Sequence, residues 1–161
     1  MQHLVVRHVE PSDAKTVAAM IEEIERYYGS TSIQPIDERL TQVEAALFGT
    51  PPLAYCVLAL SGDEVQGLAA YSFLWPAAGS THSLFVKELY VRPDGRRLGT
   101  GTRLMQEMQA IAAATPGCSR VEWMTDRENE GARAFYQQLG FEEFEGKVNY
   151  RVESDIPGPL G

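Results

Sequence analysis

The spacing of apolar residues changes several times along the first half of the chain. An apolar, β-branched run at residues 3–9 predicts a strand. Apolar residues at helical spacing then predict a helix that begins near Ser12 or Asp13, because either side chain can cap its free amides. A second helix is expected from Asp37. Apolar runs separated by turn residues predict a three-stranded meander over residues 53–60, 65–75 and 83–91.

The second half of the chain alternates again between helix and strand spacing. A helix is expected over residues 99–114, a short strand over 121–125, and a helix over 129–139 that Gly140 ends. Residues 141–152 are expected to supply one or two final strands. This order of elements predicts an α/β fold with a mixed sheet and helices on its faces.

The composition is that of one globular domain. The 161 residues, 44% hydrophobic and 22% charged, are too few for two good cores and too apolar for a disordered chain. No apolar run approaches the roughly 20 residues of a membrane helix, and the first residues lack the pattern of a signal peptide. We therefore expect a cytoplasmic protein with no membrane partner, folded as one domain over residues 1–153, with a flexible tail at 154–161.

The charge and the ligand-forming residues narrow the classes of partner. A formal net charge of −8 argues against nucleic acid, because phosphate binding needs a basic face, and it favours a cationic small molecule. Cys56 and Cys118 form no CxxC pair, and His3, His8 and His82 lack metal-ligand spacing. We expect no disulfide and no metal site.

One segment, residues 88–104, has the pattern of an anion site. A strand ends there, and Gly99 and Gly101 open a helix whose first amides can bind phosphate. Glycine suits this position because a side chain would hold a phosphate away from the backbone. Positive charge gathers here against an acidic background, at Arg92, Arg96, Arg97 and Arg103. The alternative is a glycine-rich turn with incidental arginines.

This segment does not match two common phosphate loops. A Walker loop requires a lysine after its last glycine, whereas Gly101 is followed by Thr102 and Arg103. A dinucleotide fingerprint requires a small residue where this chain has Leu104. A plain nucleotide-binding domain is therefore the weakest alternative.

Two blocks of sequence carry a family resemblance. The first is Arg96-x-x-Gly99-x-Gly101, preceded by the strand Leu89-Tyr90-Val91. The second is Asn129-x-x-Ala132-x-x-Phe135-Tyr136-x-x-x-Gly140-Phe141. In this order and separation the blocks resemble the GCN5-related N-acetyltransferase superfamily, and the likeness covers nearly the whole chain. It implies a mixed central sheet of six to seven strands flanked by about four helices.

The resemblance implies acetyl-CoA as the cofactor. Its pyrophosphate would lie on the glycine loop, and its pantetheine arm would pair with the preceding strand like an added strand. The Leu89 amide would donate to the thioester carbonyl. The residues implied in cofactor binding are Leu89, Tyr90, Val91, Arg96, Arg97, Leu98, Gly99, Thr100, Gly101, Thr102, Asn129, Ala132 and Tyr136.

The resemblance also implies that Tyr136 is the general acid that protonates the departing CoA thiolate. The alternative is that Tyr136, beside Phe135, is a core residue. For the base we select Glu88, because a glutamate among apolar strand residues is unusual. Its alternative role is a salt bridge with an arginine. Strand alternation is expected to put four side chains on one face: Leu84, Val86, Glu88 and Tyr90.

The acceptor implied is a primary amine of a small molecule. Within the superfamily the chain is most similar to diamine acetyltransferases of the spermidine/spermine type, for instance at Ile24-Glu25-Arg26-Tyr27. Lys87 and Tyr28 stand where that subgroup commonly carries acids, which leaves a polyamine substrate open. Aromatic rings beside acids suit a cation, and the expected substrate-binding residues are Tyr27, Tyr28, Trp75, Glu25 and Glu88.

Two other functions stay open at this point. The meander and the loop at 76–82 could border a groove for a protein or peptide substrate of N-acetylation. A non-catalytic acetyl-CoA-binding module is the other alternative. The resemblance further implies a homodimer, formed through the C-terminal strands around residues 148–152.

Overall fold

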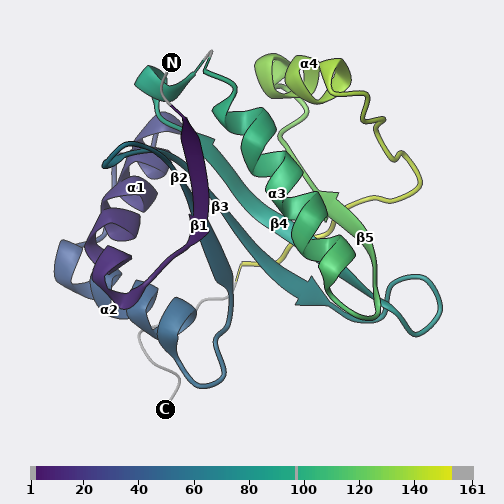
Figure 1. The fold of residues 1–161 in the computed structure, drawn as a ribbon, viewed down its shortest axis with the longest axis horizontal. Coiled ribbons are helices and arrows are strands. Elements are labelled where there is room, and N and C mark those ends of the chain that lie inside the picture. Colours follow the sequence, from purple (N-terminus) through teal and green to yellow (C-terminus); the bar gives the residue numbers. More distant parts are fainter. Residues whose placement is uncertain (1–2, 97, 154–161) are drawn as a thin grey trace. The chain divides into compact units, whose positions relative to one another are not determined.

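The fold is described from a computed structural model that covers residues 3–96 and 98–153 (Figure 1). Arg97, one of the expected phosphate contacts, and the expected tail at 154–161 lie outside the described residues. The chain divides into two compact units, Met1–Met124 and Thr125–Gly161. Each unit is therefore described by itself.

The first unit is built on one mixed sheet. Its strands lie in the order β1 to β5, with β1 to β4 antiparallel and β5 parallel to β4. This confirms the three-stranded meander. The bounds are Leu4–His8 for β1, Tyr55–Ser61 for β2, Glu64–Leu74 for β3, His82–Val91 for β4 and Cys118–Trp123 for β5.

The expected six to seven strands are thus five in the described residues. The missing strands were assigned to residues 141–152, which form neither helix nor strand. A strand needs a neighbour for its backbone hydrogen bonds. The described residues 125–153 of the second unit contain no strand that could act as this neighbour.

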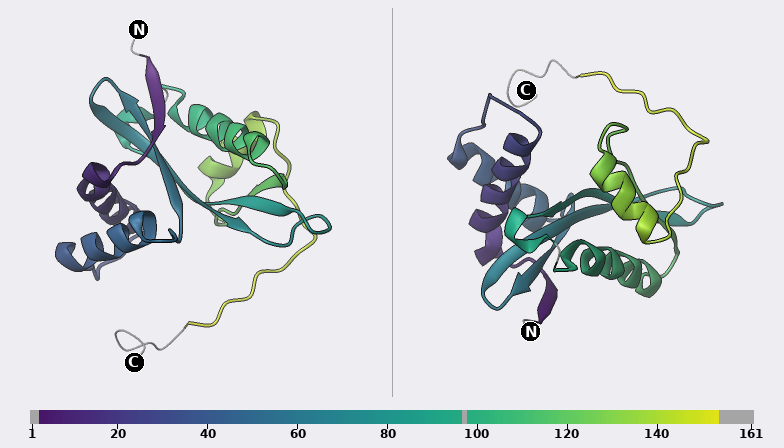
Figure 2. Two further views of the ribbon diagram at one scale, coloured as in Figure 1. Left: turned by 60° about the horizontal axis from the view of Figure 1, so that its bottom comes forward. Right: turned by 90° about the horizontal axis from the view of Figure 1, so that it is seen from above.

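Two helices cover one face of the sheet and a third covers the other (Figures 1 and 2). Helices α1 (Ala14–Tyr27) and α2 (Ile36–Phe48) pack through residues such as Met20 and Val43 on Leu58 and Leu68. Helix α3 (Thr100–Ala114) packs through Leu104 and Met108 on the opposite face. The adjacent residues Leu68 and Ala69 enter different cores because successive strand side chains point to opposite faces.

The start of α1 differs from its expected cap. A 3₁₀ turn, Pro11–Asp13, precedes the helix, and Asp13 caps none of the amides of α1. Its carboxylate instead accepts two hydrogen bonds from Arg7 on β1, at 2.7 and 3.1 Å. These bonds lower the pKa of Asp13, so the side chain ties β1 to the helix start as an ion pair.

Strand β4 contains a bulge that reverses its two faces. Glu88 pairs with Ala70 of β3, whereas the neighbouring Tyr71 pairs with Val86, so Lys87 is an extra residue in the ladder. Leu84 and Val86 therefore contact the α3 core, while Tyr90 contacts the core under α1. The expected face of Leu84, Val86, Glu88 and Tyr90 was wrong, because the inserted residue shifts the alternation by one.

The same bulge marks the place where β4 loses its second neighbour. The ladder with β5 ends at Val86, which pairs with Trp123. Beyond it, residues Glu88 to Val91 pair with β3 alone. One backbone edge of this segment, which we call the open segment (residues 88–91), has no strand partner within the part of the chain that the structure describes.

Candidate functional site

The open segment leads into a loop that ends at a helix N-terminus capped by no side chain. A 3₁₀ turn, Pro93–Gly95, begins this loop, and Gly99 adopts the left-handed conformation at φ +77° before α3 begins. The first helical hydrogen bond runs from the Arg103 amide to the Gly99 carbonyl, at 2.9 Å. The amides of Thr100, Gly101 and Thr102 therefore have no helical acceptor and can donate to an anion.

Strand β3 forms the floor of this loop, and two glycines let it approach. A side-chain carbon on Gly67 would lie 2.6 Å from the Tyr90 carbonyl oxygen and 3.3 Å from the Thr100 methyl group. One on Gly95 would lie 2.9 Å from Gln66. The buried Thr100 hydroxyl donates to the Gly95 carbonyl at 2.9 Å and so closes the loop onto the helix.

The arginines of the segment differ in what they bind. Arg92 is paired with Glu23 at 2.8 Å, and Arg103 with Glu107 at 3.0 Å. Arg96 is the one described arginine of the segment that forms no ion pair with a described residue. Its Nε donates to the Val91 carbonyl at 3.2 Å, which places its guanidinium beside the loop.

These features suit a coenzyme that carries a diphosphate and an extended amide-containing arm. Uncapped amides and Arg96 offer donors to phosphate oxygens. The open edge of residues 88–91 offers backbone groups to an extended arm. The described residues thus fit acetyl-CoA. Among the described residues no cluster of three metal-ligating side chains occurs.

Glu88 lies on the open segment, on the face of the sheet that carries α1 and α2. It stands beside Ala70, whose other strand neighbour is the buried Cys56 of that core. Burial raises the pKa of Glu88, and the nearby Lys87 only partly opposes this. No arginine or lysine forms an ion pair with Glu88 within the described ranges, which removes support from its alternative role in a salt bridge.

The expected substrate-binding residues are brought together only in part. Tyr27 and Tyr28, at the end of α1, are both exposed, and their rings meet edge to face at 5.3 Å. The Arg96 guanidinium lies over the Tyr27 ring, 5.5 Å from its centre. Trp75 lies instead in the loop that leads into β4 and donates to the Ser80 carbonyl. Since β4 has ten residues, about 30 Å at the usual rise separates its two ends.

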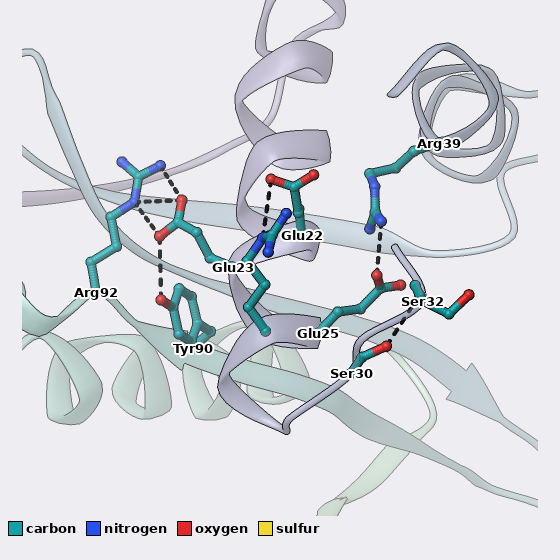
Figure 3. Close-up of polar contacts among 9 residues, drawn as sticks. Glu22, Glu23, Glu25, Ser30, Ser32, Arg39, Tyr90 and Arg92 are labelled. Carbon is teal, nitrogen blue, oxygen red and sulfur yellow. Dashed lines mark hydrogen bonds and ion pairs between the residues drawn. The ribbon is translucent and has the colours of Figure 1, made fainter. Parts of the chain in front are cut away.

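Glu25 is held by an arginine that sequence reasoning missed. Arg39 of α2 donates from Nη2 to a Glu25 oxygen at 2.8 Å (Figure 3). Its side chain is only 2% exposed, and its Nε and Nη1 atoms are buried without a hydrogen-bond partner. No pattern in the sequence marks Arg39, because charged residues at such helix positions are usually solvent-exposed.

The second unit contains α4 (Glu130–Gln138) and the remaining expected residues. The Asn129 side chain caps this helix by accepting a hydrogen bond from the Ala132 amide, at 3.0 Å. Two of the expected cofactor contacts are therefore bonded to each other. Tyr136 is half-buried, and its ring lies 5.2 Å from that of Phe135.

Comparison with known proteins identifies the fold and then the family. The aminoglycoside N-acetyltransferase AAC(6')-Iy, solved in complex with CoA, has the same fold, with a TM-score of 0.76 and 21% identity over 96% of this chain and 97% of that one. The two proteins thus share one fold. The acetyltransferase (GNAT) family model matches residues 17–141, most of the chain. The chain belongs to this family of acyltransferases, whose acetyl donor is acetyl-CoA.

Further relatives agree with this assignment. An uncharacterized N-acetyltransferase of Bacillus subtilis, YhfO, is 26% identical over 90% of this chain and 94% of its own length. An integron cassette protein from the mobile metagenome of V. cholerae has a TM-score of 0.84 at 25% identity, over 94% of this chain and 93% of that one. An aminoglycoside N(6')-acetyltransferase of Acinetobacter genomosp. 13 is 38% identical over 42% of this chain and 45% of its own length. None of these supports the diamine subgroup in particular.

Proposed function

We propose that this protein transfers an acetyl group from acetyl-CoA to a primary amine of a small molecule, by direct attack in a ternary complex. The observation that carries the proposal is the position of Glu88. This half-buried carboxyl has no ion-pair partner among the described residues, and it lies on the open segment of β4, which continues into the loop before the uncapped N-terminus of α3. Acyl donor, amine and proton acceptor can meet at such a place.

Binding of the coenzyme rests on the loop and the open strand. The amides from Leu98 to Thr102, with Arg96 and Arg97, would hold the diphosphate, and the backbone of Leu89, Tyr90 and Val91 would hold the pantetheine arm. Bound there, acetyl-CoA supplies an acetyl group activated as a thioester. The Leu89 amide would donate to the thioester carbonyl and stabilise the charge that develops on its oxygen.

Glu88 is the proposed proton acceptor. An alkyl ammonium with a pKa near 10.4 must lose a proton before it attacks, which costs roughly 4–5 kcal/mol at pH 7. A carboxylate with a raised pKa is a better base than an ordinary glutamate and can take this proton directly or through water. A bond then forms between the amine nitrogen and the acetyl carbon, the nitrogen gives up its second proton to solvent, and the carbon–sulfur bond breaks.

Tyr136 is the proposed proton donor to the departing sulfur. The phenol gives its proton to the thiolate, so that CoA leaves as a thiol, and solvent returns the proton to the tyrosine. Asn129, which caps the same helix, and Ala132, whose amide donates to the Asn129 side chain, are the other proposed contacts of the second unit with the coenzyme arm.

The proposed acceptor contacts lie at the end of α1. Tyr27 and Tyr28 present exposed rings, and Glu25 presents a carboxylate fixed by Arg39. We leave Trp75 out of this set because it lies at the other end of β4. A polyamine and an aminoglycoside are both cationic amines that suit this chemistry. The resemblance to diamine acetyltransferases supports the first, and the partial aminoglycoside relative supports the second.

The test is an acetyl-transfer assay on an amine panel. Purified protein is given acetyl-CoA with spermidine, putrescine, an aminoglycoside or a peptide with a free α-amine, and mass spectrometry detects the acetylated product. Turnover of a small amine supports the proposal. Turnover of the peptide alone would favour protein N-acetylation, and tight CoA binding with no acetylated product would favour a non-catalytic module.

A homodimer in the cytoplasm completes the proposal. Phe144, Val148, Tyr150 and Val152 are at least 77% exposed, and apolar residues alternating along a chain pair well with a strand of a second copy. The free thiols Cys56 and Cys118 suit a reducing compartment. Among the described residues, no helix is long and apolar enough to cross a membrane. Light scattering that gives twice the mass of 17.8 kDa, and a monomer for Tyr150→Lys, would support the dimer.

A further inference from the structure

The end of helix α1 carries three glutamates that are paired with arginines in three different places (Figure 3). Glu22 pairs with Arg26 one turn further along the same helix, at 3.6 Å. Glu25 pairs with Arg39 of α2. Glu23 alone of the three reaches β4. Because these three glutamates lie on one helix and pair with different arginines, substituting them one at a time compares the effects of the three ion pairs.

Glu23 is bound to two of the side chains that the open segment and its continuation send toward α1, those of Tyr90 and Arg92. Arg92 donates to both oxygens of Glu23, with distances of 2.8 to 3.2 Å. The Tyr90 hydroxyl donates to the same carboxylate at 3.2 Å. The pair is about one-third exposed on each side, so the surrounding solvent screens it only partly.

The residue that Glu23 holds is the junction between the strand and the phosphate loop. The Arg92 amide donates to the Gln66 carbonyl at 2.8 Å, and its Nη1 donates to the Val65 carbonyl at 3.0 Å. Its own carbonyl accepts a hydrogen bond from the Gly95 amide. A change in the position of Arg92 would therefore move both the last residues of the strand and the first turn of the loop.

One turn further along α1, Tyr27 contacts the same region. It is four residues after Glu23 and hence lies on the same side of the helix. The Arg96 guanidinium lies over its ring at 5.5 Å, a cation–π contact. Glu23 and Tyr27 thus form one stripe of α1 that contacts Tyr90, Arg92 and Arg96 in turn.

We propose that Glu23 is a positioning residue for coenzyme binding, and that Tyr27 supports it by orienting Arg96. This inference rests on the proposed function, because it assigns the α1 stripe to the acetyl-CoA site.

The experiment compares CoA affinity in two charge-matched variants of the full chain. Isothermal titration with CoA is expected to show a dissociation constant roughly three- to tenfold weaker for Glu23→Gln, in line with the loss of charge-assisted hydrogen bonds that are only partly screened. The control, Glu22→Gln, removes a more exposed pair on the same helix that contacts nothing in β4, and it is expected to bind CoA like the wild type.

Kinetics separate positioning from a general loss of structure. Glu23→Gln is expected to raise KM for acetyl-CoA while kcat at saturating acetyl-CoA stays within about twofold of the wild type. If Glu23→Gln does not fold, Tyr90→Phe and Arg92→Lys remove single members of the cluster and carry the same expectation. Tyr27→Leu removes the ring under Arg96 and should bind CoA more weakly.

Two results would overturn the inference, and they have different meanings. Equal CoA affinity in Glu23→Gln, Glu22→Gln and wild type would reject the positioning role and leave the proposed function intact. Failure of the wild type itself to bind CoA would reject both.

Discussion

The carbonyl oxygen of Tyr90 lies 2.6 Å from the point that a side-chain carbon on Gly67 would occupy. Carbon and oxygen do not approach so closely without displacement, so the neighbouring strand depends on glycine at this position. The Thr100 methyl and the Leu104 side chain lie 3.3 Å from the same point. Gly67 therefore sets how closely the open segment and the first turn of α3 approach each other.

Gly67→Ala is expected to weaken coenzyme binding. The added methyl pushes Tyr90 and the start of α3 apart, at a stability cost of about 1–3 kcal/mol typical of overpacking. Because the displaced groups belong to the proposed phosphate loop, KM for acetyl-CoA should rise in the folded variant. Denaturant titration and steady-state kinetics measure the two effects. A variant that loses stability yet keeps the wild-type KM would show that the loop is insensitive to this contact.

Glu88→Gln is expected to abolish most turnover and to change the pH profile. Burial places the pKa of Glu88 above that of an ordinary glutamate, so the acidic limb of kcat/KM should lie at higher pH than a free carboxyl would give. That limb should be absent from any residual activity of the glutamine variant. An unchanged limb in Glu88→Gln would assign it to another group.

The same substitution is expected to stabilise the folded protein at neutral pH, although it lowers activity. A carboxyl whose pKa is raised by folding binds more protons in the folded state, so the free energy of unfolding falls as pH rises from the unfolded pKa through the folded one. Glu88→Gln removes this slope and should be more stable than the wild type at neutral pH. Urea titrations at several pH values between 4 and 8 measure it, and a less stable variant at pH 7 would contradict the inferred desolvation.

Tyr136→Phe tests the proposed acid. Loss of the phenolic proton should lower kcat by about 10²–10⁴-fold, the usual contribution of general acid catalysis. The ring remains, so its contact with Phe135 and the affinity for CoA should remain as well. Normal turnover by this variant would show that the sulfur obtains its proton elsewhere.

The two cysteines should differ in reactivity. Burial raises the pKa of Cys56 to about 12, so this thiol has almost no thiolate at neutral pH and no access to reagents. Cys118 is partly exposed. A thiol reagent should therefore modify Cys118 alone in the native protein and both cysteines after denaturation. As a control, native Cys56→Ser and native wild type should be modified rapidly and to the same extent. Cys56 is inaccessible in the wild type and absent from the variant.

The features predicted correctly from the sequence are those that local rules determine. The meander, the helix expected over residues 99–114 and the helix expected over 129–139 all follow from residues close together in the chain. Turn residues, apolar spacing and cap preferences act over a few positions, so a single sequence reveals them. The cofactor and the family follow from two such local blocks.

The features missed depend on residues far apart in the chain. Glu23 meets Arg92 across 69 positions, and Gly67 approaches Thr100 only because β3 passes under the loop. The face reversal at Lys87 could not be predicted, because strand alternation assumes a regular ladder and a bulge depends on the partner strand. Arg39 was missed for a similar reason, since only the packing of α2 on α1 buries it.

The extra residue at Lys87 joins two properties that a regular strand would keep independent. By shifting the ladder it turns the Glu88 carboxyl toward α1, and it stands where β5 stops pairing with β4. In a regular ladder that included Lys87, the alternation would present the carboxyl to α3 instead. The orientation of the proposed proton acceptor and the opening for the proposed acyl donor therefore depend on one irregularity of the strand, which constrains how far such a site can diverge by insertions and deletions.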